Sequence, residues 1–213
     1  MHAAALEPVP HNADHFEKAM QNGMIALDIR SAEAFAGAFI PGSLAIPVDM
    51  VPVYAGWFLS YDQPIGIICD HFEDVQKAVR YLSRLGYDNI AGYLENGLTA
   101  WEVSGRSYDR IPAVHAAEIV SRIQNEQNFV LLDVRKKEEV EAGRLPGAIH
   151  IIVGELPHKL DQIPKDMTVT TFCGSGQRAI IAASILKQHG FDKVEDSLGS
   201  MAACSAVGCP IVK

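Results

Sequence analysis

The sequence predicts an α/β protein of two tandem domains, each a mostly parallel sheet with helices on both faces. Three observations predict this fold class. Short apolar runs alternate with longer helix-like segments, as in parallel sheets joined by crossover helices. The chain repeats itself once, at offsets of 103 to 105 residues. Its 213 residues suffice for two domains of about 100 residues each.

The second half has the clearer succession of elements. Apolar or β-branched runs predict strands at 129–134, 148–152 and 167–172, and a fourth near Val194. A polar helix is expected after the first strand, over 136–144, and it leads to a turn at Pro146-Gly147. An apolar helix is expected over 178–189, where Gly190 has the position of a C-terminal helix cap.

The first half repeats this order. Strands are predicted at 24–29, 43–48 and 64–69, followed by a helix over 75–86. The helix carries one apolar stripe, formed by Val75, Ala78, Val79, Leu82 and Leu85. It therefore has one face that packs on a sheet.

An internal repeat sets the expected domain boundaries. Residues 26–46 resemble residues 131–151 at an offset of 105. The corresponding residues are Asp28 and Asp133, Arg30 and Arg135, Glu33 and Glu138, and Pro41-Gly42 and Pro146-Gly147. We therefore expect domains at 1–106 and 107–213, joined by a linker over 105–114.

Charge excludes two classes of partner. The net charge of −8 argues against nucleic acid and against an anionic membrane surface. Residues 1–106 carry 6 Lys and Arg against 13 Asp and Glu, and residues 107–213 carry 12 against 13. A small anion would therefore meet less repulsion at the second half.

Two further features bear on location. No apolar run reaches the roughly 18 residues of a membrane span, and the start of the chain lacks the pattern of a signal peptide. A cytoplasmic location is the expectation. The four cysteines are too dispersed for a disulfide framework, so free thiols are expected at Cys69, Cys173, Cys204 and Cys209.

The segment CGSGQR, residues 173–178, carries the predicted chemistry. Cys173 closes an apolar strand and Arg178 opens a helix. Two glycines allow the backbone to turn its N–H groups inward, and the helix N-terminus favours a negative charge. Cys173 is thus the candidate nucleophile, in a cradle formed by Gly174, Ser175, Gly176, Gln177 and Arg178. The alternative is a buried structural cysteine before a glycine-rich turn.

The residues LDVR, GRLPGAIHI and CGSGQR together resemble a rhodanese domain. The resemblance covers both halves, from about residue 15 onward, and implies the rhodanese fold and a sulfurtransferase activity. Three positions differ from the usual pattern. Arg144 stands in place of His, Gly199-Ser200 in place of Gly-Gly, and Cys204 in place of a Trp that Trp101 keeps in the first half.

Two segments of the first half carry a more specific resemblance: IPGSLAIPVDMVPVYAGWFLSYDQPI, residues 40–65, and GYDNIAGYLENGLTAW, residues 86–101. They resemble the degenerate rhodanese domain that follows a metallo-β-lactamase-fold domain in persulfide dioxygenase fusions. This resemblance implies such a dioxygenase as a partner or fused domain. The segment HNADH, residues 11–15, does not match the metal motif of that fold. No metal site and no cofactor are therefore expected in this chain.

Cys69 aligns with Cys173, but its loop reads CDHFED. Asp74 stands at the position of Arg178, and the acidic loop disfavours a thiolate and repels anions. We expect an inactive first domain; a specialised acceptor thiol is the alternative.

Other residues are expected to be structural. Arg135 is expected to pair with Glu138 or Glu139. Cys204 is expected to fill the space of the missing Trp, with a resolving-thiol role as the alternative.

The expected function is transfer of sulfane sulfur from thiosulfate or a small persulfide, through a Cys173 persulfide, to a thiol or cyanide. One alternative is a non-catalytic docking or sulfur-relay module for a persulfide-oxidising partner. Another is a phosphatase or arsenate reductase, although those enzymes use one more loop residue than the six found here.

Overall fold

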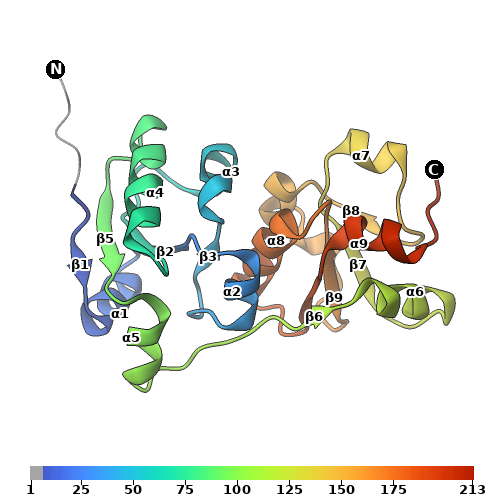
Figure 1. Ribbon diagram of the computed structural model, residues 1–213, viewed down its shortest axis with the longest axis horizontal. Coiled ribbons are helices and arrows are strands. Elements are labelled where there is room, and N and C mark those ends of the chain that lie inside the picture. Colours follow the sequence, from blue (N-terminus) through green and yellow to red (C-terminus); the bar gives the residue numbers. More distant parts are fainter. Residues whose placement is uncertain (1–6) are drawn as a thin grey trace. The chain divides into compact units, whose positions relative to one another are not determined.

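The computed structural model describes residues 7–213, which form two compact units (Figure 1). Among these residues, the first unit runs up to Ala34 and over Ala38–Asp109, and the second comprises Phe35–Gly37 and Arg110–Lys213. Residues 1–6 lie outside the described part, and the expectation that the start of the chain is not a signal peptide falls partly on them. Each unit contains one sheet and its own core.

The first unit contains a five-stranded parallel sheet in the order β1-β5-β4-β2-β3. Its strands are β1 (Pro10–His11), β2 (Ile25–Asp28), β3 (Leu44–Ala45), β4 (Ile65–Ile68) and β5 (Ile90–Leu94). The central strand β4 is buried along its whole length. This explains its unbroken apolar run, because helices cover both faces of a parallel sheet.

The second unit repeats the topology with the order β6-β10-β9-β7-β8, again with parallel pairs throughout. Its strands are β6 (Ala113–Val114), β7 (Val130–Asp133), β8 (Ile149–His150), β9 (Val169–Phe172) and β10 (Val194–Ser197). The predicted α/β fold with two similar domains is therefore confirmed. The segment 105–114 is not a plain linker, since its last two residues form the edge strand β6.

Helices connect the strands of both sheets. The first half has α1 (Ala13–Gln21), α2 (Ala32–Gly37), η1 (Val48–Met50), α3 (Val51–Phe58), α4 (Phe72–Arg84) and α5 (Gly97–Val103). The second has α6 (Ala116–Gln124), α7 (Lys137–Ala142), η2 (Val153–His158), η3 (Leu160–Gln162), α8 (Gln177–Gln188) and α9 (Ser200–Val207). Helix α8 buries every residue from 179 to 186, whereas α4 buries one stripe. The apolar composition of α8 follows from this burial.

An Asp–Arg pair ends the second strand of each half. Arg135 donates from Nε and Nη2 to Asp133, and its Nη2 also donates to the carbonyl of Gly143. Arg30 makes the same contacts with Asp28 and the carbonyl of Ala38. The expected pairing of Arg135 with a carboxylate of Glu138 or Glu139 is wrong, because the nearer Asp133 satisfies the guanidinium inside the unit.

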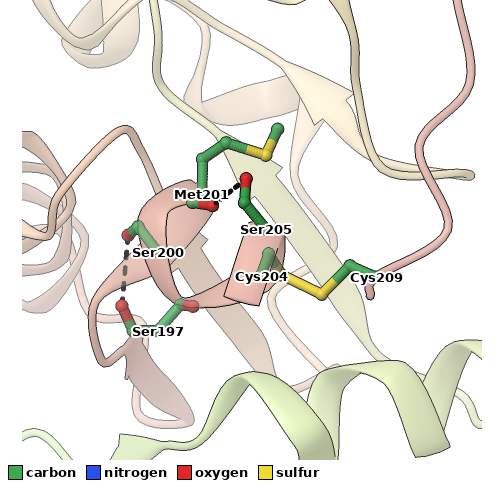
Figure 2. Close-up of a disulfide and its surroundings, with 6 residues drawn as sticks. All are labelled: Ser197, Ser200, Met201, Cys204, Ser205 and Cys209. Atoms are coloured by element: carbon green, nitrogen blue, oxygen red, sulfur yellow. Dashed lines mark hydrogen bonds between the residues drawn. A yellow bond between two sulfur atoms is a disulfide. The ribbon is translucent and has the colours of Figure 1, made fainter. Parts of the chain in front are cut away.

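Cys204 and Cys209 form a disulfide, drawn in Figure 2. The expectation of four free thiols is therefore wrong, although Cys69 and Cys173 are free. Gly208 ends α9 with φ 71°, and the resulting turn brings Cys209 back to the helix. Both half-cystines lie in the core cluster of the second unit, so Cys204 does fill an apolar space as expected.

Candidate functional site

Cys173 lies directly after β9 and four residues before α8 begins at Gln177. Its side chain is fully buried. The backbone N–H of Gly176 donates to Cys173 Sγ at 3.0 Å. Gly176 has φ 103°, a left-handed conformation that glycine adopts without strain, and it caps the N-terminus of α8. The sulfur thus sits against an N–H group at the positive end of a helix.

Helix α9 holds the backbone around Cys173. The N–H of Cys173 donates to Ser200 Oγ at 3.0 Å, and that hydroxyl donates to the carbonyl of Ser197, as the dashed line in Figure 2 shows. The first N–H groups of α9 complete the contact, with Met201 donating to the carbonyl of Cys173 and Ala202 to that of Gly174. These bonds use N–H groups that a helix start leaves unpaired.

Sequence reasoning missed the role of Ser200. The replacement of the usual Gly-Gly by Gly199-Ser200 was the available signal. It adds a hydroxyl where the loop needs an acceptor, and Ser200 is fully buried with φ 46°. The backbone of Ser200 thus lies in the left-handed region that glycine adopts more readily, and its hydroxyl accepts the N–H of Cys173.

The predicted cradle residues have different environments. Gly176 is buried and contacts the sulfur, and Gly174 is half-buried. Ser175 and Gln177 are exposed to solvent. Their side chains are therefore accessible to a ligand that approaches the loop from outside.

Arg178 forms a two-pronged ion pair with Glu139 of α7. The guanidinium Nη1 lies 2.5 Å from Oε2, and Nη2 lies 2.8 Å from Oε1. Chiefly because of these hydrogen bonds, the pKa of Glu139 is lowered to about 2. Glu139 also accepts the backbone N–H of Lys136 at the start of α7. The predicted anion-binding residue is therefore engaged by a carboxylate that remains ionised at neutral pH.

The ion pair lies against the loop itself. A methyl group placed on Gly174 would come within 3.0 Å of Arg178 Nη2 and 3.7 Å of Glu139 Oε1. Glycine at this position therefore leaves room for the paired side chains beside Cys173. Glu139 is a site residue that the sequence had assigned to a different arginine.

Cys69 occupies the corresponding place in the first unit, directly after β4. Burial raises the pKa of its thiol to about 12, with further contributions from Asp70, Asp28 and Asp74. Asp74 lies in the first turn of α4, and Arg178 lies at the corresponding position in the first turn of α8. The environment of Cys69 therefore keeps it a neutral thiol, which agrees with the acidic loop.

Residues 7–213 contain no group of three or more His, Cys, Asp or Glu residues that could hold a metal ion. In HNADH, His11 Nε2 contacts the carbonyl of Ala91 at 2.8 Å, and Asn12 caps α1. Across the same residues, every helix is too short or too polar to cross a membrane.

Known proteins resemble both halves of the chain. The family model described as a rhodanese-like domain matches residues 12–104 and 116–206. A sulfurtransferase of Allochromatium vinosum is 29% identical over 99 residues, which are 46% of this chain and 92% of the relative. A thiosulfate sulfurtransferase of Pseudoalteromonas translucida is 31% identical over 81 residues, 38% of this chain and 75% of the relative. The crystal structure of a thiosulfate sulfurtransferase from Pseudomonas aeruginosa matches at 20% identity and TM-score 0.45, covering 96% of this chain and 43% of that chain.

Proposed function

Because the chain belongs to the rhodanese-like family, with one such domain in each half, we propose that its second half transfers sulfane sulfur through Cys173. The thiolate of Cys173 attacks the outer sulfur of a donor, and a new S–S bond forms. The S–S bond of the donor breaks, and its electron pair leaves with the remainder of the donor. Cys173 then carries the sulfur as a persulfide.

One observation carries this proposal: the N–H of Gly176 donates to Cys173 Sγ at the N-terminus of α8. A hydrogen bond to sulfur and a helix dipole both favour negative charge on the thiolate and on the persulfide that replaces it. The donor would be bordered by the loop residues Gly174, Ser175, Gly176, Gln177 and Arg178. A structural cysteine would not need the left-handed glycine, and the loop that begins at Cys69, CDHFED, contains no glycine.

In the second step a thiol or cyanide attacks the outer sulfur of the Cys173 persulfide. The S–S bond breaks, and its electron pair returns to Cys173 as a thiolate. Donor and acceptor therefore react in turn, which gives ping-pong kinetics.

We propose that the first half, 1–106, is catalytically silent and that the second half, 107–213, carries the reaction. The raised pKa of Cys69 and the net charge of −7 over that half both oppose reaction with an anionic donor. We propose a metallo-β-lactamase-fold persulfide dioxygenase as the partner or fused domain that shares its persulfide substrate. The resemblance of the first half to the rhodanese region of such fusions supports this pairing.

The test is the mass of the intact protein after incubation with thiosulfate or glutathione persulfide, followed by removal of the donor. The unchanged protein should gain one sulfur atom, and Cys173→Ser should gain none. Cys69→Ser is the matched control, because it removes the other free thiol, and it should load like the unchanged protein. Loading of Cys173→Ser would overturn the assignment. Hydrolysis of p-nitrophenyl phosphate without sulfur loading would favour a phosphatase.

A further inference from the structure

The Glu139–Arg178 pair belongs to the second unit alone. At the repeat offset of 105 residues, Ala34 corresponds to Glu139, and Asp74 stands at the position of Arg178. Both partners of the pair are therefore absent where the acidic loop surrounds Cys69. The first unit nevertheless forms the same sheet with the same strand order. The fold does not require this ion pair.

The Asp–Arg pairs show the opposite pattern. Asp28 with Arg30 and Asp133 with Arg135 make the same contacts in both units, and all four residues are buried. A structural ion pair has therefore been kept through the duplication, whereas the pair beside Cys173 has not. The Glu139–Arg178 pair thus occurs only in the unit that has the glycine-containing loop, which associates the pair with the chemistry of that loop.

The pair determines how much positive charge the loop offers to a ligand. Both terminal nitrogens of Arg178 are engaged by the two oxygens of Glu139, and the side chain of Arg178 is 16% exposed. A paired guanidinium and carboxylate have no net charge, and their fields largely cancel at a third group a few ångströms away. A doubly charged anion at the loop gains little from such a pair.

We propose that Glu139 is a specificity-determining residue that favours persulfide donors over thiosulfate at Cys173. This inference rests on the proposed sulfurtransferase function and names the donor class of the same site. Glu139 acts through the charge of Arg178, beside the backbone of Gly174, without touching the transferred sulfur.

The two donors differ in charge at the reacting sulfurs. With thiosulfate, the Cys173 thiolate attacks the outer sulfur, the S–S bond breaks, and the electron pair leaves on sulfite, a dianion. With a protonated persulfide RSSH, the same attack gives the protonated Cys173 persulfide and releases RS⁻. The thiosulfate reaction places a doubly charged donor and then a doubly charged leaving group beside Glu139. The persulfide reaction places there a donor with uncharged sulfurs and then a leaving group with one negative charge on sulfur.

The experiment measures the rate of Cys173 persulfide formation at low donor concentration, by rapid quenching and intact mass. Thiosulfate and glutathione persulfide are the two donors, and no acceptor is needed. In Glu139→Gln the carboxylate charge is removed, while the amide oxygen can still accept the Lys136 N–H. We expect the thiosulfate rate to rise about tenfold, with the persulfide rate within about twofold of the unchanged protein.

Glu138→Gln is the matched control. It removes the same charge from the exposed neighbouring position on α7 and should change the ratio of the two rates by less than about twofold. Glu139→Ala is the second variant, and it carries the residue found at position 34 on the corresponding helix. It should shift the ratio in the same direction.

The inference would be overturned if the ratio of the thiosulfate rate to the persulfide rate were unchanged in Glu139→Gln. A fall in this ratio, as expected if Arg178 must be held in place by Glu139, would overturn it as well. Failure of both donors to load the unchanged protein would instead overturn the proposed function. That result would be visible before any variant was compared.

Discussion

Glu139 is the residue whose ionisation the fold changes most clearly. Its pKa is lowered to about 2 from the ordinary value of 4.5, mainly by hydrogen bonds from Arg178. A carboxyl group with a depressed pKa in the folded state contributes stability above its unfolded pKa. This contribution is lost as pH falls from about 4.5 toward about 2. Because 36% of the Glu139 side chain is exposed, solvent screening reduces the contribution to about 1 kcal/mol.

Glu139→Gln should therefore weaken the dependence of stability on acid. Between about pH 5 and about pH 3, the unchanged protein should lose about 1 kcal/mol more free energy of unfolding than the variant. Urea unfolding at the two pH values measures this difference. Glu138→Gln, in which the Arg178 pair is intact, should behave like the unchanged protein. Equal losses in all three proteins would mean that the pair is not formed in solution.

Among the elements, α9 connects the Cys173 loop to the disulfide. Its first residues, Ser200 to Ala202, hold the backbone of Cys173 and Gly174, and Cys204 further along the same helix is bonded to Cys209. Figure 2 shows Ser200 and Cys204 on this one helix. Helix α9 also packs on α6. The disulfide therefore fixes the C-terminal side of a helix whose N-terminal side holds the backbone of Cys173.

Removing the disulfide in Cys209→Ser should destabilise the protein by about 2 kcal/mol, the value expected for a short closed loop. Sulfur transfer should slow as well, because a less constrained α9 holds the Cys173 loop less firmly. Urea unfolding without reductant and the rate of sulfur loading measure the two effects. Cys69→Ser, which removes a thiol outside the disulfide, is the control for turnover. Equal stability of Cys209→Ser and the unchanged protein would contradict the prediction.

Ser200→Ala tests the other end of α9. The substitution leaves the N–H of Cys173 without its acceptor inside the protein, which should cost about 1–3 kcal/mol. Sulfur loading should fall too, since the Cys173 backbone loses one of its two hydrogen bonds with α9. Ser205→Ala is the control, because the exposed hydroxyl of Ser205 donates to the carbonyl of Met201 within α9 itself. Unchanged stability and loading in Ser200→Ala would show that water replaces the hydroxyl.

At the scale of the whole molecule, one fold occurs twice with opposite electrostatics. Both units have the same strand order and place a free cysteine after the central strand. Burial, with nearby carboxylates, raises the pKa of the Cys69 thiol to about 12, whereas the sulfur of Cys173 accepts a backbone N–H at a helix N-terminus. The duplicated chain thus has a cysteine at two equivalent positions, and they differ in burial, nearby charge and hydrogen bonding.

The chain should accordingly hold one sulfane sulfur after saturation with either donor. Cys69→Ser should leave that stoichiometry and the turnover unchanged, because a neutral buried thiol does not attack a sulfur donor. Cyanide-labile sulfur per chain, measured after removal of the donor, gives the number directly. Two labile sulfurs per chain, one of them lost in Cys69→Ser, would contradict the prediction and indicate a relay between two sites.

The central strands and the long helices could be predicted because burial leaves a local record. Strand β4 and helix α8 read as apolar runs, and Gly190 follows α8 with φ 76° as the expected cap. The edge strands β1 and β6 were missed. Each has two residues, too few to show a period, and pairing with a distant strand is what defines them.

The sequence by itself determined the duplication, the α/β fold of each half and the contrast between CGSGQR and CDHFED. These features lie in contiguous residues, whose pattern records burial, turns and local charge. Only the tertiary structure decided that Arg178 pairs with Glu139, 39 residues away, and that Cys204 and Cys209 are joined. Glu138 and Glu139 are neighbouring residues of the same type, so the sequence does not distinguish which of them pairs with an arginine. The packing of α7 beside the loop decides which of them reaches the arginine.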